Sequence, residues 1–102
     1  MKNILLCCGG GMSTSLLVQK MQHEAEGRGL KIDIEALPVS EASDHLDGVG
    51  VLLLAPQVAY ARVNIEADLE RAGVKLVMLD MLDFGRMNAP KILDQAIAAI
   101  EG

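Results

Sequence analysis

Aromatic side chains are almost absent from this chain of 102 residues. It contains no tryptophan, and Tyr60 and Phe84 are its two aromatic residues. Because hydrophobic residues still make up 51% of the sequence, a core is expected, and it must be built from Leu, Ile, Val, Ala and Met. Such a core suits a parallel α/β sheet better than an antiparallel sandwich, whose strands usually alternate in polarity and carry aromatic residues.

Long apolar runs and clusters of basic residues are lacking as well. No apolar stretch approaches the roughly 18–20 residues of a membrane span. The short apolar segment near the N-terminus is followed at once by glycines, which argues against a signal peptide. The formal net charge is −5, so nucleic acid is a poor partner, since phosphate neutralisation needs Lys and Arg. We expect a cytoplasmic protein that forms one domain over residues 1–102.

Cysteine is scarce, and the two cysteines are neighbours. Cys7 and Cys8 cannot pair with each other without severe strain, so we expect free thiols and a reducing compartment. Neighbouring side chains of a strand point to opposite faces. We therefore predict that Cys7 packs in the core and that Cys8 is the reactive thiol. A redox protein ranks last, because the pair lacks the Cys-x-x-Cys spacing.

Apolar runs, glycines and prolines divide the chain into alternating strands and helices. Two runs are continuous and indicate strands buried on both faces, whereas residues 31–37 alternate and indicate an edge strand. This order predicts a four-stranded parallel open sheet with helices on both faces, and a ligand site beyond the carboxyl ends of the strands. The expected strands are 2–7, 31–37, 49–55 and 74–79; the expected helices are 13–26, 56–73 and one from residue 90 onward, with one helical turn in 40–47 and a loop over 80–89.

The first strand leads into a turn rich in glycine and hydroxyl residues. Such a turn exposes backbone N–H groups, and the N-terminus of the following helix adds partial positive charge. This environment favours a thiolate and binds phosphate. We therefore predict that Cys8 is a nucleophile and that the next seven residues bind the phosphoryl group: Gly9, Gly10, Gly11, Met12, Ser13, Thr14 and Ser15.

Two known phosphate-binding loops do not fit this turn. A nucleotide-binding P-loop requires a lysine, and none lies between Gly9 and Ser15. The low-molecular-weight tyrosine phosphatases carry a cysteine, five residues and an arginine, and the arginine position falls on Thr14 here. Without that guanidinium, attack of water on a phosphocysteine loses a major stabilising group. We expect a phosphoryl carrier, with a phosphatase-like hydrolase as the alternative.

Two segments resemble one protein family. Residues 5–18 resemble the phosphorylation loop of the lactose/cellobiose-type IIB component of the bacterial sugar phosphotransferase system. That family reads Cys-x-x-Gly-Met-Ser-Thr-Ser, which places the nucleophile at Cys8. Residues 53–60 resemble its Leu-Gly-Pro-Gln-Ile-Ala-Tyr segment. The departures are small: Ala55 stands where glycine is usual, and the Gly9-Gly10 pair stands where Ser-Ala-like residues are common.

The resemblance implies a phosphoryl relay. A phosphohistidine of a IIA protein gives its phosphoryl group to Cys8, which passes it to a sugar bound in the membrane IIC component. The sugar would be a β-glucoside disaccharide such as cellobiose, or a related sugar, and no metal or other cofactor is implied. The second segment makes Pro56, Gln57 and Tyr60 candidates for contacts with the loop or a partner. In the alternative interpretation, Pro56 opens a helix and Tyr60 is a half-buried ring.

The histidines and the aspartates after the fourth strand are predicted to have structural rather than catalytic roles. His23 and His45 are expected on the surface. Asp80 and Asp83 follow the fourth strand, near the general acid of the phosphatases, but loop capping or a solvated acidic rim is favoured. The six methionines are expected to fill the core or an interface, because no metal-ligand spacing is present.

Overall fold

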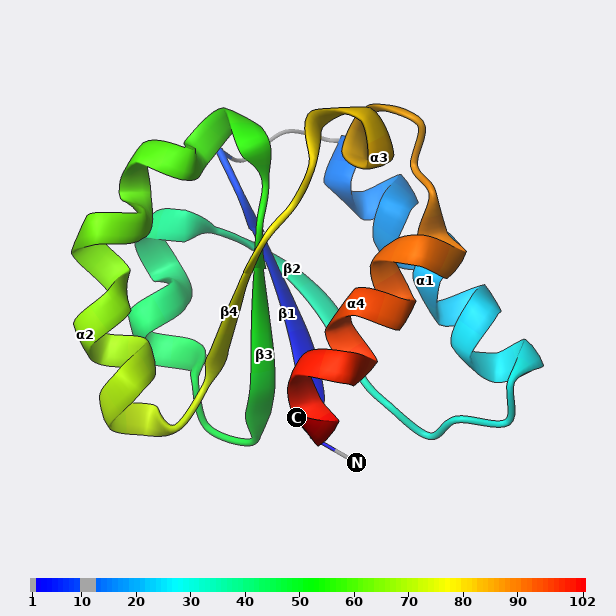
Figure 1. The fold of residues 1–102 in the computed structure, drawn as a ribbon, viewed down its shortest axis with the longest axis horizontal. Coiled ribbons are helices and arrows are strands. Elements are labelled where there is room, and N and C mark those ends of the chain that lie inside the picture. Colours follow the sequence, from blue (N-terminus) through cyan, green and yellow to red (C-terminus); the bar gives the residue numbers. More distant parts are fainter. Residues whose placement is uncertain (1, 10–12) are drawn as a thin grey trace.

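The computed structural model of the protein describes residues 2–9 and 13–102. Its four strands form one parallel sheet in the order β2-β1-β3-β4, with helices on both faces, which confirms the predicted architecture (Figure 1). The strands are β1 (Asn3–Cys8), β2 (Ile34–Pro38), β3 (Val49–Leu54) and β4 (Lys75–Met78). The helices are α1 (Ser13–Gly27), α2 (Arg62–Ala72), α3 (Met81–Gly85) and α4 (Ala89–Glu101), with 3₁₀ helices η1 (Val39–His45) and η2 (Pro56–Ala61).

The two central strands are those with continuous apolar runs. Every residue of β3 is buried, and so is β1 from Ile4 to Cys8. β2 lies at one edge, as its alternating sequence predicts, and β4 lies at the other. Because all four strands are parallel, their carboxyl ends meet along one edge of the sheet, which we call the carboxyl edge. The opposite edge is the amino edge.

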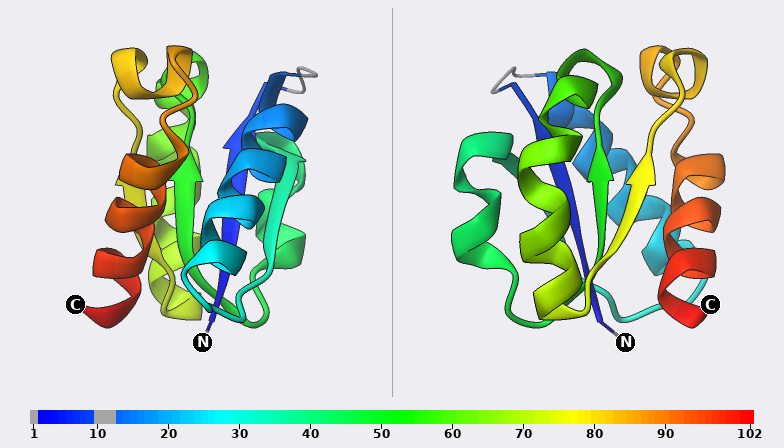
Figure 2. Two further views of the ribbon diagram at one scale, coloured as in Figure 1. Left: turned by 90° about the vertical axis from the view of Figure 1, so that its right-hand side faces the viewer. Right: turned by 60° about the vertical axis from the view of Figure 1, so that its left-hand side comes forward.

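Each face of the sheet carries its own core cluster. Ile4 and Leu6 pack with Leu17 of α1 and Leu93 of α4 on one face. Leu5 and Cys7 pack with residues of η1, η2 and α2 on the other. Figure 2 shows α1 and α4 on one side of the strands and α2 on the other. The alternation of strand side chains thus sorts the apolar residues into two layers.

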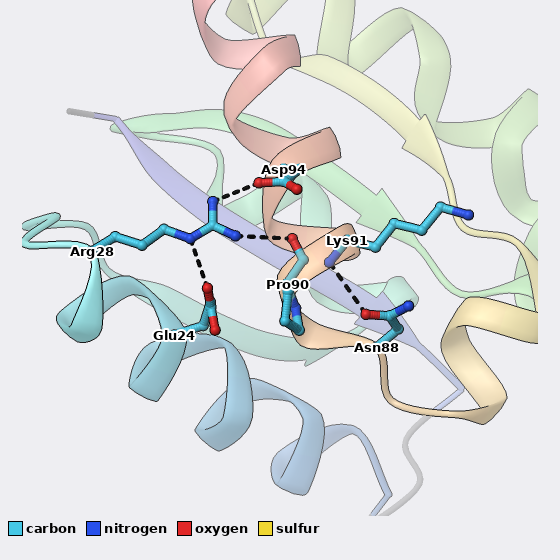
Figure 3. Close-up of polar contacts among 6 residues, drawn as sticks. All are labelled: Glu24, Arg28, Asn88, Pro90, Lys91 and Asp94. Carbon is cyan, nitrogen blue, oxygen red and sulfur yellow. Dashed lines mark hydrogen bonds and ion pairs between the residues drawn. The ribbon is translucent and has the colours of Figure 1, made fainter.

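Arg28, at the end of α1, joins this helix to α4 (Figure 3). Its Nε donates to Glu24 Oε2 at 2.8 Å, its Nη1 to Asp94 Oδ1 at 2.5 Å and its Nη2 to the Pro90 carbonyl oxygen at 3.3 Å. The sequence pattern predicts only a solvated face for Glu24 and Arg28. The partner from α4 lies far away along the chain, so helical spacing alone could not identify it.

The expected helix over residues 56–73 is divided in the structure. Pro56 opens η2, as predicted, but Val58 has non-helical backbone angles (φ −116°, ψ 23°) before α2 begins at Arg62. Val58 is buried against the sheet, and its N–H donates to the Ala55 carbonyl oxygen at 3.1 Å. This tight turn at the strand end prevents a continuous α-helix. The polar segment after β2 also differs, because η1 extends beyond the single turn expected.

The expected loop over residues 80–89 contains a helix, α3. Asp80 caps it, since its Oδ1 accepts from the Leu82 N–H at 2.6 Å. The capping aspartate is a signal that the sequence contains, but a glycine in this position favours a loop, whereas Gly85 lies in the last turn of α3. Met87, with φ at 51°, then takes the left-handed conformation that follows the helix.

Gly50 lies where the two ends of the chain meet the sheet. A Cβ placed on Gly50 would be 2.7 Å from Lys2 Cβ and 3.0 Å from Ile100 Cγ1. Lys2 and Ile100 therefore both lie at the amino edge, where α4 ends in Figure 1.

Replacement of Gly50 by alanine should therefore destabilise the fold. We expect Gly50→Ala to lower the free energy of unfolding by about 1–3 kcal/mol through overpacking. Gly27→Ala is the matched control, because a Cβ there meets nothing within 4 Å and alanine favours a helix. Urea denaturation measures both. Equal stability of Gly50→Ala and the parent chain would contradict this packing.

Candidate active site

Cys8 is the last residue of β1 and is held by the sheet. It pairs with Pro38 of β2, and the carbonyl oxygen of Cys7 accepts the Ala55 N–H at 2.9 Å. The sequence places Cys8 in the turn, whereas the structure places it in the ladder. Its side chain is 6% exposed, at the carboxyl edge. The backbone at Cys8 is thus held by the strands on both sides of β1.

The sulfur of Cys8 faces the start of α1. Cys8 Sγ lies 3.3 Å from Thr14 Oγ1, and the Leu37 carbonyl oxygen lies 4.0 Å from the same sulfur. Thr14 is 3% exposed. This contact places a hydroxyl where the related phosphatase pattern has an arginine, so a donor without charge lies beside the thiol.

The N-terminus of α1 supplies the electrostatic setting. Ser13, Thr14 and Ser15 form its first turn, whose backbone N–H groups have no acceptor within the helix. The first turn contains no carboxylate that would neutralise the partial positive charge there. Of the predicted phosphate-binding residues, Ser15 and Gly9 are exposed, and Gly10, Gly11 and Met12 lie outside the described residues.

The second motif of the sequence lies beside the first. A Cβ on Gly9 would contact Val58 Cγ1 at 3.5 Å, an ordinary packing distance, so η2 adjoins the residue after Cys8. Val58 is a residue of the site region that the sequence analysis does not predict. The signal that could have identified it is its apolar side chain within the second motif. Pro56 is half-buried and Gln57 is exposed. Tyr60 is 76% exposed rather than half-buried as expected.

Cys7 has the environment of a core residue, which confirms its predicted place. Its side chain is fully buried in the cluster beneath η2 and α2. Burial, together with the neighbouring Cys8, raises the pKa of the Cys7 thiol from its ordinary value of 9.0 to about 12. A thiol needs to ionise before it attacks. Cys7 therefore remains protonated at neutral pH.

The acidic residues after β4 have structural partners. Asp80 caps α3, as the sequence suggests, but Asp83 is not part of a solvated rim. It is 6% exposed and its Oδ2 lies 3.0 Å from Lys91 Nζ. The ammonium group compensates the buried carboxylate. His23 and His45 are exposed, as predicted.

Neither a metal cluster nor a membrane span is found in the part of the chain that the structure describes. Among these residues, no three His, Cys, Asp or Glu side chains come together in a way that could hold a metal ion. No helix among them is long and apolar enough to cross a membrane. A groove of about 600 Å³ lies between α2 and β4, away from Cys8, with Leu69, Leu76 and Met78 in its lining.

A cysteine at the carboxyl edge of a parallel sheet, next to a helix N-terminus, is the arrangement expected of an α/β phosphoryl-transfer domain. The family model of the lactose/cellobiose-specific IIB subunit of the phosphotransferase system matches residues 3–95. The chain belongs to this family. It is accordingly a phosphotransferase component of the sugar phosphotransferase system.

Similar proteins support this assignment over nearly the whole chain. The cellobiose-specific EIIB component of Lactococcus lactis subsp. lactis (strain IL1403) is 41% identical over 100 residues, with 93% of each chain covered. The galactose-specific EIIB component of Lactococcus lactis subsp. cremoris (strain MG1363) has the same identity and coverage. The solution structure of the cellobiose-specific IIB component from Borrelia burgdorferi is 37% identical, with a TM-score of 0.82 over 98% of this chain and 92% of that one.

The two thiols should differ in their reaction with iodoacetamide. At pH 8, a pKa of about 12 leaves about one Cys7 thiolate in ten thousand. We expect the folded protein to be alkylated at Cys8 and to react at Cys7 only after unfolding in urea. Peptide mass spectrometry measures both sites, with Cys7→Ala and Cys8→Ser as controls. Equal labelling of Cys7 and Cys8 in the folded chain would contradict the assignment of Cys7 to the core.

Proposed function

We propose that Cys8 accepts a phosphoryl group from the phosphohistidine of a IIA protein and passes it to a sugar. The single observation that carries this proposal is the position of Cys8 Sγ, beside the Thr14 hydroxyl in the first turn of α1. We further propose that residues 1–102 act as one phosphocarrier domain, in which Gly9 to Ser15 surround the phosphoryl group.

Both transfers are in-line displacements at phosphorus. In the first, the Cys8 thiolate forms an S–P bond while the P–N bond to histidine breaks, and the imidazole keeps the electron pair. In the second, a sugar hydroxyl forms an O–P bond, the S–P bond breaks, and the hydroxyl proton is released. The phosphocysteine carries up to two negative charges, which the first-turn N–H groups of α1 and the Thr14 hydroxyl compensate.

The same surroundings favour a carrier over a hydrolase. Thr14 replaces the arginine that would stabilise attack by water. Asp83, the buried candidate for a general acid, contacts Lys91. It belongs to the element after β4, and one strand separates β4 from β1, which puts the two strand ends about 10 Å apart. A phosphatase-like reaction therefore remains only as an outcome of the test below.

We propose a β-glucoside disaccharide such as cellobiose, or a related sugar, as the final acceptor. The relatives support a sugar of this class without choosing one, because the cellobiose-specific and galactose-specific EIIB components are equally identical to this chain. The partners would be a IIA protein and a membrane IIC component, with the domain in the cytoplasm and docked transiently at IIC. Pro56, Gln57 and Tyr60 are proposed to contact the loop or a partner.

Phosphorylation of Cys8 can be tested with a phosphorylated IIA protein. We expect intact-protein mass spectrometry to show one added phosphoryl group on the parent chain and on Cys7→Ala, and none on Cys8→Ser. Peptide mapping should place the group on Cys8. A phosphoryl group mapped to another residue would contradict the proposal. Sustained release of inorganic phosphate by the isolated domain would instead identify a hydrolase.

The Thr14 hydroxyl should accelerate phosphoryl acceptance. Removal of one hydrogen bond to a charged group costs about 1.5–3 kcal/mol, so Thr14→Val should slow the transfer about tenfold or more. Thr14→Ser keeps the hydroxyl and should retain most of the rate. Rapid-quench kinetics measures the transfer, and the melting temperature of each variant controls for folding. An equal loss in Thr14→Ser and Thr14→Val would indicate that packing of the methyl group is what matters.

A further inference from the structure

The outer side of β4 has no partner strand among the residues that the structure describes. β4 ends the sheet order β2-β1-β3-β4 and pairs with β3. The Leu79 N–H, just after β4, donates to the Leu54 carbonyl oxygen of β3 at 3.0 Å. Successive residues of a strand direct their backbone groups to alternate sides. Leu76 and Met78 therefore direct their N–H and C=O groups away from β3, where a further strand can pair with them.

The groove of about 600 Å³ between α2 and β4, which we call the α2–β4 groove, follows this side of the strand. Leu76 and Met78 contribute to its lining, and Met78 is 38% exposed. α2 runs from the carboxyl edge towards the amino edge, and β4 returns in the opposite direction, as Figure 1 shows. The groove thus combines outward backbone groups of a strand with the side of a helix.

The charged side chains of the α2–β4 groove balance each other. Arg62, Glu66 and Glu70 line it from α2, and Lys75 lines it from β4. The three residues of α2 are four positions apart, so they form one stripe along the helix. The chain as a whole has a net charge of −5, whereas this surface carries two charges of each sign. An acidic protein can therefore approach the groove without net repulsion from it.

We propose that two copies of this chain pair through the α2–β4 groove, with their β4 strands antiparallel. This inference goes beyond the proposed function and does not rest on it. A two-fold axis at Val77 would place Leu76 opposite Met78 of the second copy. These are the residues whose backbone groups point outward, so each such pair would exchange two N–H···O=C hydrogen bonds. The two sheets would then be continuous.

The same axis brings the two copies of α2 together with complementary charges. Three residues of strand rise about 10 Å, as far as about seven residues of helix, so the turn at Gly73 places Glu66 level with Val77. Because the two helices are antiparallel, Arg62 would meet Glu70 of the second copy, and Glu70 would meet Arg62. Glu66 keeps its ion pair with Arg62 inside each copy. This self-complementarity selects a second copy as the occupant.

Pairing through the α2–β4 groove would leave both active sites open. β3 separates β4 from β1, and the side chain of Cys8 lies at the carboxyl edge. Since the paired strands are antiparallel, the carboxyl edges of the two copies would point in opposite directions. Each Cys8 would therefore remain accessible, and phosphoryl transfer would not depend on pairing.

Exchange of charges across the groove tests the pairing. Analytical ultracentrifugation of the full chain, over a range of concentrations, should show twice the mass of 10.9 kDa. Arg62→Glu and Glu70→Arg should each raise the dissociation constant about tenfold or more, because like charges then face each other at two places. The double variant Arg62→Glu/Glu70→Arg should restore it. Lys20→Glu, on an exposed position of α1, is the matched control and should leave it unchanged.

Oxidative cross-linking in the Cys8→Ser background tests the register. Val77 would face its copy at a non-hydrogen-bonded position, with the Cα atoms about 4.5 Å apart, a distance that a disulfide can bridge. Val77→Cys should therefore form a covalent dimer on non-reducing electrophoresis. Lys75→Cys is the control, since the two copies of this position would lie about 13 Å apart, and it should not cross-link.

The results also separate this pairing from the function of Cys8. The mass of one chain at every concentration would overturn the second copy as the occupant of the groove. A dimer that neither Arg62→Glu nor Glu70→Arg weakens, or that cross-links through Lys75→Cys and not through Val77→Cys, would place the contact elsewhere and overturn the proposal. None of these results bears on phosphorylation of Cys8, which the transfer from a IIA protein tests separately.

Discussion

The parallel pairing of β1 with its two neighbours is the constraint on which the site depends. β1 lies between β2 and β3, so the backbone of Cys8 is fixed before any loop is considered. The hydrogen bond from the Ala55 N–H to the Cys7 carbonyl oxygen extends the ladder to the residue just before η2. Two sequence motifs separated by two strands and a helix therefore meet at one edge. Strand pairing therefore fixes the position of Cys8, and the loop after it contributes only additional groups around the thiol.

Two of the groups that contact Cys8 Sγ are uncharged, at a site that is proposed to hold a phosphoryl group. The described contacts of its sulfur are a hydroxyl and a carbonyl oxygen, and the helix end adds partial charges from its N–H groups. Lysine or arginine would bind the phosphoryl group more tightly and would also assist its hydrolysis. Moderate stabilisation suits a group that has to be passed on. A phosphocysteine in this setting would be a temporary state between two partners.

The sequence predicts the sheet and the core position of Cys7 because both depend on local patterns. Continuous apolar runs mark β1 and β3, whereas the predicted alternation stops at the end of β1, where Cys7 and Cys8 are both buried in the same cluster. Prediction was weaker wherever a residue from another element decides the outcome. Asp83 is buried because Lys91 of α4 compensates it. Arg28 is exposed, as predicted, but its ion pair with Asp94 of α4 could not be read from helical spacing. The short helix α3 differs from the predicted loop, because Gly85 favours a loop although Asp80 offers a cap.

The two ends of the chain approach each other beside Gly50, at the amino edge of the sheet. Cys8 lies at the opposite edge, so the strands span the distance between the ends and the thiol. A polypeptide joined to either end would leave the molecule on the side away from Cys8. The domain can therefore be tethered to a membrane or to another protein while its reactive edge stays open, and such a tether would raise the local concentration of a partner without taking part in the chemistry.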